Sequence, residues 1–261
     1  MANRVVLITG ASSGVGYALA LAFARRGDHV CVTARRVDRL AELEQAVKAL
    51  PGHGEFLVIA ADVTDRAAVQ SAVDQAVARW GRLDVVVANA GVGQRGSIAD
   101  SNWDDLETLL RTNIDGVLHT IRAGVPALRT AGGGQIVIIS SVVAGMIAPY
   151  AAAYSASKTF VSNLARSLRL ELEADNIGVT DVQLGRVATE FSERRLGASG
   201  HAAKAPRLPV MTPEFVAEGI IKAVDRKQQR VVLRLFDWLI VLGNLLVPGF
   251  IGRRALKQYK T

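Results

Sequence analysis

Short runs of β-branched apolar residues recur along the chain and alternate with longer stretches that have apolar residues at helical spacing. Nearly continuous apolar runs are typical of strands covered on both faces. The expected strands are Val5–Ile8, Val30–Thr33, Phe56–Ala60, Val85–Ala88, Ile136–Ile139, Val179–Leu184 and Val231–Leu233. The expected helices are Gly16–Arg26, Arg39–Leu50, Ala67–Trp80, Trp103–Leu128, Tyr154–Ala174 and Pro213–Lys227. This alternation predicts βαβ units and a parallel sheet.

The chain lacks a composition break, repeat or linker that would divide it. With 261 residues, of which 50% are hydrophobic and 21% charged, it has material for one large core. We therefore expect an α/β fold: one doubly wound Rossmann-type domain over residues 1–261, with a parallel sheet of about seven strands flanked by helices. Cys31 is the single cysteine, so an intramolecular disulfide is excluded, and we expect it in the core.

The net charge is +7, from 31 basic and 24 acidic residues. Three Trp, four Tyr and seven Phe are few for base stacking, so nucleic acid is not the expected partner. A phosphorylated cofactor or an anionic membrane surface fits the charge better. No metal is expected, because the four histidines are not at metal-ligand spacing and the lone cysteine rules out a thiolate cluster.

A glycine-rich turn follows the first expected strand and leads into a helix. It reads Thr9-Gly10-Ala11-Ser12-Ser13-Gly14-Val15-Gly16. Gly10 would permit the tight turn, Gly14 would let the backbone approach a pyrophosphate, and Gly16 would let the helix pack on the strand. Free amides and the positive end of the helix dipole would then face the phosphates. A purely structural turn is the alternative, but it needs one glycine at most.

The end of the second expected strand bears on the choice of cofactor. NAD-binding folds usually place an Asp or Glu there, on the ribose 2′-hydroxyl. This chain reads Ala34-Arg35-Arg36 instead. Guanidinium groups match phosphate geometry, so the sequence favours NADP, with Arg35 the stronger candidate. A solvated surface position is the alternative for Arg36.

A tyrosine and a lysine lie four residues apart at the start of an expected helix, on one face. Tyr154 and Lys158 in this spacing suit general acid–base chemistry on an alcohol or carbonyl, because a neighbouring ammonium stabilises the tyrosinate. Ser141 closes the fifth expected strand, at the carboxyl edge of the sheet where open α/β folds bind ligands.

Taken together, these motifs resemble the short-chain dehydrogenase/reductase family in its compact form, over residues 4 to about 233. The family marks are the glycine turn, Asp62 after the third strand, Asn89-Ala90-Gly91 after the fourth, Asn113, Ser141, and Tyr154 with Lys158. The resemblance implies hydride transfer between a nicotinamide and a carbonyl or secondary alcohol.

The resemblance also assigns roles. It implies Tyr154 as the acid/base, Ser141 as a hydrogen-bond partner of the substrate oxygen, Lys158 on the ribose and lowering the Tyr154 pKa, and Asn113 positioning a water. The implied cofactor-binding residues are Gly10, Ser12, Ser13, Gly14, Val15, Gly16, Arg35, Arg36, Asp62, Val63, Asn89, Ala90, Gly91, Tyr154, Lys158, Gly185 and Thr189. Alternatives remain for two of them, since Asn113 could cap a helix kink and Asp62 could cap the next helix.

One position departs from the family pattern. The family usually has Pro-Gly after the sixth strand and then a Thr that reaches the nicotinamide amide. Here Gly185 and Thr189 match, but Leu184 replaces the proline. The expected cofactor geometry is therefore better defined at the phosphates than at the nicotinamide.

The leading hypothesis is an NADP(H)-dependent oxidoreductase. A non-catalytic NADP-sensing or scaffold protein on the same fold is the rival, and the complete Ser–Tyr–Lys set argues against it. A methyltransferase would leave the Tyr–Lys pair unexplained. The apolar segment Val142–Tyr150, with Gly91–Gly96 and a substrate lid over residues 190–211, is expected to wall the site, so a hydrophobic ketone, sterol or acyl chain is the expected substrate.

The last segment, residues 235–261, is strongly apolar and then basic. It is interrupted by Asp237, Asn244 and Pro248 and is too short to span a bilayer. It either packs over the substrate pocket or a neighbouring subunit, which is the favoured expectation, or forms an interfacial membrane helix. We expect a cytoplasmic protein with possible membrane association.

The family also implies a homodimer or homotetramer, paired through the helices Trp103–Leu128 and Tyr154–Ala174. The second carries Phe160, Val161, Leu164, Leu168 and Leu172 as an apolar stripe, which could instead face the sheet.

Overall fold

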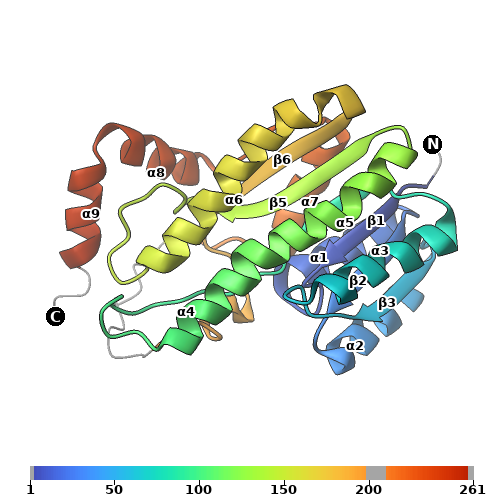
Figure 1. The fold of residues 1–261 in the computed structure, drawn as a ribbon, viewed down its shortest axis with the longest axis horizontal. Helices are drawn as coiled ribbons and strands as arrows, with labels where there is room; N and C mark the ends of the chain where they lie inside the picture. The colour runs from blue at the N-terminus through green and yellow to red at the C-terminus, as the bar shows by residue number, and fades with distance from the viewer. Residues whose placement is uncertain (1–2, 198–209, 258–261) are drawn as a thin grey trace.

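The computed structural model describes residues 3–197 and 210–257, in which a parallel sheet lies between two layers of helices (Figure 1). Its strands are β1 (Val5–Thr9), β2 (His29–Ala34), β3 (Phe56–Ala60), β4 (Val85–Ala88), β5 (Gly134–Ser141), β6 (Ile177–Leu184) and β7 (Arg230–Val231). Its α-helices are α1 (Gly14–Arg25), α2 (Val37–Lys48), α3 (Arg66–Trp80), α4 (Trp103–Leu110), α5 (Gly116–Thr130), α6 (Ala152–Glu171), α7 (Pro213–Asp225), α8 (Leu235–Leu246) and α9 (Pro248–Lys257).

The strand order is β3-β2-β1-β4-β5-β6-β7, and every pairing is parallel. The order reverses between β1 and β4, which is the topological switch point where open α/β sheets bind ligands. The predicted α/β class, the parallel sheet and the seven strands are confirmed. The last strand is shorter than predicted, with two residues.

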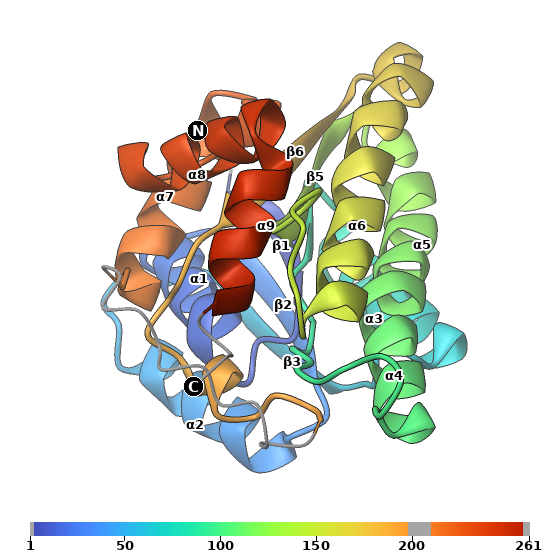
Figure 2. The same ribbon diagram turned by 90° about the vertical axis from the view of Figure 1, so that its left-hand side faces the viewer.

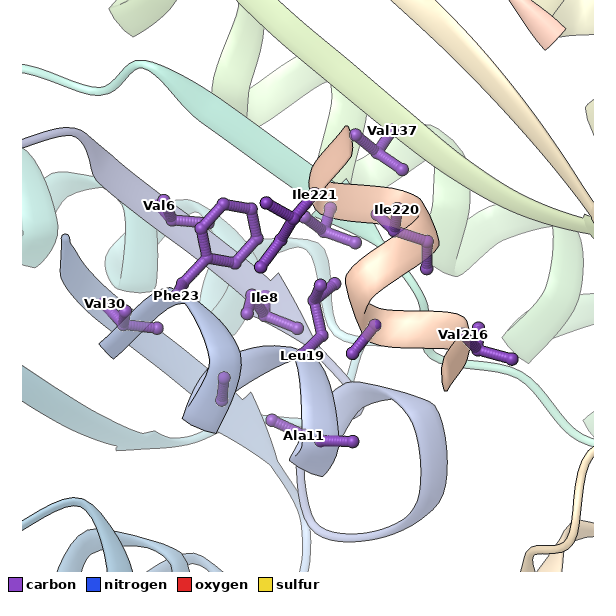
Figure 3. Packing of buried hydrophobic residues seen from close by; sticks show 14 of the residues in the cluster. Val6, Ile8, Ala11, Leu19, Phe23, Val30, Val137, Val216, Ile220 and Ile221 are labelled. Carbon is purple, nitrogen blue, oxygen red and sulfur yellow. The ribbon is translucent and has the colours of Figure 1, made fainter. Parts of the chain in front are cut away.

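The strands read as continuous apolar runs because alternate side chains enter two different cores. Val6 and Ile8 of β1 pack with α1, α2 and α7, whereas Val5 and Leu7 pack with α3, α5 and α6. Figure 3 shows the first of these cores, where Phe23 of α1 lies beside Ile221 of α7 over β1. Figure 2 shows the two helix layers on either side of the sheet. Cys31 is fully buried in the second core, as predicted, and burial raises the pKa of its thiol to about 12.

Sequence signals explain where several helices begin and end. Asp65 precedes α3 and accepts hydrogen bonds from the amides of Ala67 and Ala68, and Gly81 ends the helix in a left-handed conformation. Thr212 caps α7 in the same way, ahead of Pro213 in the first turn.

The predicted single helix over residues 103–128 is wrong in one respect. It consists of α4 and α5 joined by a π-helical segment, Arg111–Asp115, with Asn113 near its centre. A π segment inserts an extra residue into the helical repeat, and such insertions occur often at functional sites.

The predicted apolar stripe on α6 mostly faces the sheet. Val161 and Leu172 are buried in the second core, and Leu164 and Leu168 pack against it. Phe160, in contrast, is 42% exposed. Four of the five stripe residues therefore belong to the core, and only Phe160 is exposed for association.

Part of the predicted lid lies outside the described residues. Residues 190–197 contain a short 3₁₀ turn, Glu190–Ser192, and a bridge from Leu196 to Gln94. Residues 198–209 are not described, and Met211 returns to pair with Val187.

Candidate active site

The glycine turn lies at the switch point, against the end of β4. Gly10 has a φ of +69°, and a Cβ there would lie 2.6 Å from the Cα of Ala90. A Cβ on Gly16 would lie 2.5 Å from the Nδ2 of Asn89. That amide donates to the carbonyls of Thr9 at 2.8 Å and Gly10 at 3.1 Å. Asn89 thus ties the turn to the central strand, as the family resemblance implies.

The start of α1 forms an anion-binding cradle. The helix begins at Gly14, and its first turn contains no acidic side chain. Ser13 at the N-cap makes no side-chain capping hydrogen bond either, so the first amides of the helix and the positive end of its dipole are the groups expected to hold a phosphate. Ser12 and Ser13 stand at the edge of this cradle, and Val15 packs beneath it against the first core.

Two arginines follow β2 and take different positions. Arg36 donates to the hydroxyls of Ser12 at 3.2 Å and Ser13 at 2.6 Å, and pairs with Glu190 at 3.0 Å. Its side chain is 26% exposed. Arg35 is 63% exposed and lies 3.6 Å from Asp62. The structure therefore places Arg36, the weaker candidate from sequence, directly at the cradle.

The residues after β3 and β4 line the adjoining edge. Asp62 accepts from the amide and hydroxyl of Thr64, both at 2.9 Å. Asp65, not Asp62, caps α3, so the alternative role for Asp62 is wrong. The Val63 side chain is buried against Gly116. A Cβ on Gly91 would lie 3.4 Å from the Lys158 Nζ, so Gly91 brings the backbone close to the lysine.

Ser141 ends β5, and Tyr154 and Lys158 lie one helical turn apart near the start of α6, which packs on that strand. The hydroxyls of Tyr154 and Ser141 are hydrogen-bonded, and Ser141 also donates to the carbonyl of Leu184 at 3.1 Å. The Tyr154 ring lies 6.0 Å from that of Phe191. Lys158 is buried and donates to the carbonyl of Ile139 at 2.9 Å.

Burial shifts the pKa values of both α6 residues. It raises the pKa of Tyr154 above its usual value, while the Ser141 hydrogen bond and the Arg195 charge act in the opposite direction. Burial lowers the pKa of Lys158 from 10.5 to about 8, and the negative charge of Asp181 opposes that shift. The expected lowering of the Tyr154 pKa is not what this structure gives, because burial outweighs the favourable contacts.

Asn113 is fully buried in the π-helical segment. Its amide group donates to the Val92 carbonyl at 2.9 Å and to the Ser157 hydroxyl at 3.1 Å, and its oxygen accepts from the Val92 amide at 2.8 Å. Asn113 therefore joins the segment after β4 to the start of α6, within reach of Gly91 and Lys158.

The segment after β6 packs against the glycine turn. A Cβ on Gly14 would lie 3.0 Å from the Thr189 Cγ2, so the expected nicotinamide-side threonine sits against the cradle. A Cβ on Gly185 would lie 2.4 Å from the Oδ1 of Asp237, which comes from α8. Asp237 is buried and bound at 2.7 and 2.8 Å by Arg234. The C-terminal tail is thus anchored at the end of β6.

Sequence reasoning missed a buried carboxylate behind the site. Asp181 in β6 is 2% exposed and accepts from the hydroxyls of Ser140 and Ser162, the latter at 2.6 Å, and from Gln183 at 3.0 Å. Ser162 follows Lys158 by one helical turn, on the same face of α6. The available signal was a charged residue inside a strand expected to be buried on both faces.

The predicted apolar wall forms an outer pocket. A hollow of about 550 Å³ is lined by Gly145, Met146, Ile147, Ala148, Pro149, Ala152, Ser155, Ala156 and Thr159. Neither Tyr154 nor Lys158 lines it, so it flanks the catalytic groups. The tail reaches the same segment: Asn244 donates to the carbonyl of Gly145 at 2.9 Å, and Gly252 packs against Ile147.

Comparison with known proteins identifies the family. Residues 4–198 match the family described as short chain dehydrogenase. The chain belongs to the short-chain dehydrogenase/reductase family. It is 35% identical over 234 residues to the glycine betaine reductase ATRR of Emericella nidulans, covering 87% of this chain but only 18% of that protein. It is 32% identical to 11-beta-hydroxysteroid dehydrogenase 1A of Arabidopsis thaliana, over 99% of this chain and 76% of the relative.

Solved structures of the family resemble the fold and differ in cofactor. An alcohol dehydrogenase of Thermococcus sibiricus, complexed with 5-hydroxy-NADP, has a TM-score of 0.75 and 27% identity, covering 87% of this chain and 93% of that one. A Mycobacterium paratuberculosis short chain dehydrogenase bound to NAD has a TM-score of 0.78 and 29% identity, covering 87% and 94%. The chain is thus an oxidoreductase of a family that binds nicotinamide cofactors.

Proposed function

We propose that this protein is an NADP(H)-dependent oxidoreductase that interconverts a hydrophobic carbonyl compound and its secondary alcohol. The observation that carries the proposal is the hydrogen-bonded pair of Ser141 and Tyr154, with the buried Lys158 one helical turn on, at the same edge of the sheet as the glycine turn. When bound, the nicotinamide supplies or accepts the hydride. Tyr154 exchanges a proton with the substrate oxygen, and Ser141 holds that oxygen by a hydrogen bond. We expect the protein in the cytoplasm.

The raised pKa of Tyr154 favours proton donation. A phenol whose pKa lies above its usual value remains protonated throughout the neutral range, so it can donate to an oxygen that becomes an alkoxide. Lys158 would hold the ribose of the cofactor, and Asn113 would position a water, as the family resemblance implies. Both side chains are buried beside Gly91.

The cofactor preference rests on the arginine at the cradle. Arg36 is preorganised by Ser12 and Ser13, so its guanidinium can meet a 2′-phosphate without losing side-chain freedom. Arg35 beside Asp62 adds positive charge at the same edge. We assign further residues of the glycine turn and of the segments after β3, β4 and β6 to cofactor binding. They are Gly10, Gly14, Val15, Gly16, Val63, Ala90, Gly185 and Thr189.

The proposal is tested by following NADPH and NADH absorbance at 340 nm with a panel of carbonyl compounds and secondary alcohols. We expect oxidation of NADPH with apolar ketones, at a higher kcat/KM than with NADH. If no compound changes the absorbance while NADPH still binds, the non-catalytic sensor on the same fold replaces this proposal.

A homo-oligomer is proposed on the family resemblance and on exposed apolar residues of α4 and α6. Trp103, Leu110, Phe160 and Leu170 are 41–77% exposed on these two helices, which lie side by side. Light scattering at micromolar concentration should give two or four times the 27.8 kDa chain mass. Phe160→Glu with Leu170→Glu should reduce that mass. A monomer in the unaltered protein would contradict the proposal.

Asp181→Asn tests the buried carboxylate as a positioning residue that acts through Lys158. Removing the negative charge that supports the ammonium should move the Lys158 pKa below about 8. A cation with a lower pKa loses its charge at lower pH, so the alkaline loss of NADPH affinity should move to lower pH. NADPH titrations between pH 6 and 9 measure this shift.

Ser162→Ala is the matched control for that experiment. It removes one hydrogen bond to Asp181 at 2.6 Å but keeps the carboxylate charge. We expect its loss of NADPH affinity at alkaline pH to occur close to the pH found for the unaltered protein. If NADPH affinity fell at the same alkaline pH in all three proteins, Asp181 would only support packing.

A further inference from the structure

The C-terminal helices α8 and α9, with the residue that joins them, expose eight large apolar side chains, which we call the tail ridge. Its members are Leu235, Phe236, Trp238, Leu239, Leu245, Leu246, Val247 and Phe250, each 39–76% exposed. The nine other exposed large apolar residues in the described chain are scattered over α2, α4, α6, α7 and the loops, with at most two on any one helix. An apolar surface of this extent, gathered on one segment, marks an interaction site.

The tail ridge spans a sharp bend between two helices. Helices α8 and α9 meet at 115°, and neither is long and apolar enough to cross a bilayer, although the bent pair together meets the length and composition of a broken span. They have 12 and 10 residues, or about 18 and 15 Å at 1.5 Å per residue. The exposed side chains Leu245, Leu246, Val247 and Phe250 lie at the bend. Such a bend suits insertion into the interfacial layer, about 5–10 Å deep.

The charge beside the tail ridge points to anionic lipid. Arg253, Arg254 and Lys257 are exposed on α9, and no acidic residue follows Asp237 in the sequence. Asp237 is itself buried against Gly185 and paired with Arg234. An apolar ridge with Trp238 and flanking cations matches the layered chemistry of a headgroup region. A symmetric contact between two copies would instead bring like charges together.

The inner side of the tail is fixed to the substrate side of the site. Asp237 contacts Gly185 at the end of β6, Asn244 binds the Gly145 carbonyl, and Gly252 packs on Ile147. Figures 1 and 2 show α8 and α9 projecting at the end of the sheet where the segment after β5 lies. Any partner that bound the tail ridge would therefore also lie close to residues 142–150.

We propose that the tail ridge docks this protein peripherally on anionic bilayers and presents residues 142–150 to the lipid, so that an apolar carbonyl substrate enters from the membrane. The favoured expectation from sequence, packing over the substrate side, and the membrane expectation then describe the two sides of one element. The docking stands on the ridge and its charge alone, whereas the delivery of substrate rests on the proposed function.

The docking test is co-sedimentation of the full chain with vesicles of phosphatidylcholine alone or with 30% phosphatidylserine. Binding should be at least tenfold stronger on the anionic vesicles and should fall as salt rises, because screening weakens the attraction of Arg253, Arg254 and Lys257. Absence of binding, or salt-insensitive binding equal on both vesicles, overturns the proposal.

Matched phenylalanine variants assign the binding to the tail ridge. Phe250→Ser removes a 62% exposed ring from the ridge, and Phe215→Ser removes a 48% exposed ring from α7. Phe250→Ser, and separately Arg253→Gln with Arg254→Gln, should each lower binding several-fold, while Phe215→Ser should not. Unchanged binding in both test variants overturns the proposal. So does an oligomer in the unaltered chain that Phe250→Ser converts to monomer without affecting vesicle binding.

A second measurement separates delivery from catalysis. Rates are compared for an apolar ketone held in anionic vesicles and for a water-soluble ketone. Phe250→Ser should lose rate several-fold only with the vesicle-held ketone; equal rates from both sources overturn lipid delivery. If the unaltered chain binds vesicles but turns over neither ketone, docking stands and the proposed function fails.

Discussion

Replacing Tyr154 with Phe is expected to lower carbonyl turnover by about 100- to 10,000-fold while leaving NADPH affinity close to that of the unaltered protein. A positioned general acid contributes about that factor, and the substitution removes only the hydroxyl that supplies the proton. The ring keeps its place beside Phe191, 6.0 Å away, so packing is preserved. Steady-state rates and NADPH fluorescence titration measure the two effects.

Ser141→Ala provides the comparison. It removes the hydroxyl that contacts Tyr154 and the Leu184 carbonyl, but leaves the proton donor in place. We expect a smaller loss of kcat than in Tyr154→Phe, again with NADPH affinity retained. If Tyr154→Phe kept more than about a tenth of the rate, another group would be the acid, and the catalytic assignment would be wrong.

The strands and the layer order could be predicted from sequence because each strand is buried on both faces. Val5 and Leu7 enter one core and Val6 and Ile8 the other, so the run carries no polar interruption and differs from the helical stretches. The glycine turn was equally readable, since close approaches at Gly10 and Gly16 exclude any side chain. Positions without room for a Cβ must be glycine, so they can be recognised from the sequence.

Features that depend on tertiary contacts were not readable in the same way. The π segment around Asn113 has no residue signature, because its extra residue is held by bonds to Val92 and Ser157 from distant segments. The α6 stripe has the same periodicity whether it faces the sheet or a second copy. The apolar tail composition predicted a helix at a surface, but only the contacts of Asp237 and Asn244 show which side is fixed.

The two adjacent arginines illustrate a limit of a different kind. Sequence placed both at the end of β2 but could not tell which side chain turns towards the glycine turn, since that depends on Ser12 and Ser13 accepting hydrogen bonds from Arg36. Arg35 is directed to Asp62 instead. We therefore expect Arg36 to contribute more than Arg35 to cofactor binding, which is the reverse of the expectation from sequence.

Arg36→Ala is expected to weaken NADPH binding by about 10- to 100-fold and to leave NADH binding nearly unchanged. A charge-assisted hydrogen bond contributes about 1.5–3 kcal/mol, and each 1.4 kcal/mol is a factor of ten in affinity. Arg35→Ala should have a smaller effect, because its side chain is 63% exposed and its charge is screened. Fluorescence titration with both cofactors gives the ratio of dissociation constants for each variant.

Arg39→Ala is the matched control, because Arg39 also lies near Glu190, at 3.9 Å, but its hydrogen bond goes to Glu42 and not to Ser12 or Ser13. It should leave the ratio of NADPH to NADH affinity unchanged. Adding Ala34→Asp to the double variant Arg35→Ala, Arg36→Ala should turn the preference towards NADH, since a carboxylate there accepts from the ribose 2′-hydroxyl and repels a 2′-phosphate. An unchanged affinity ratio in Arg36→Ala and in this triple variant would refute the NADP assignment, because Arg36 is the arginine that binds both Ser12 and Ser13 beside the glycine turn.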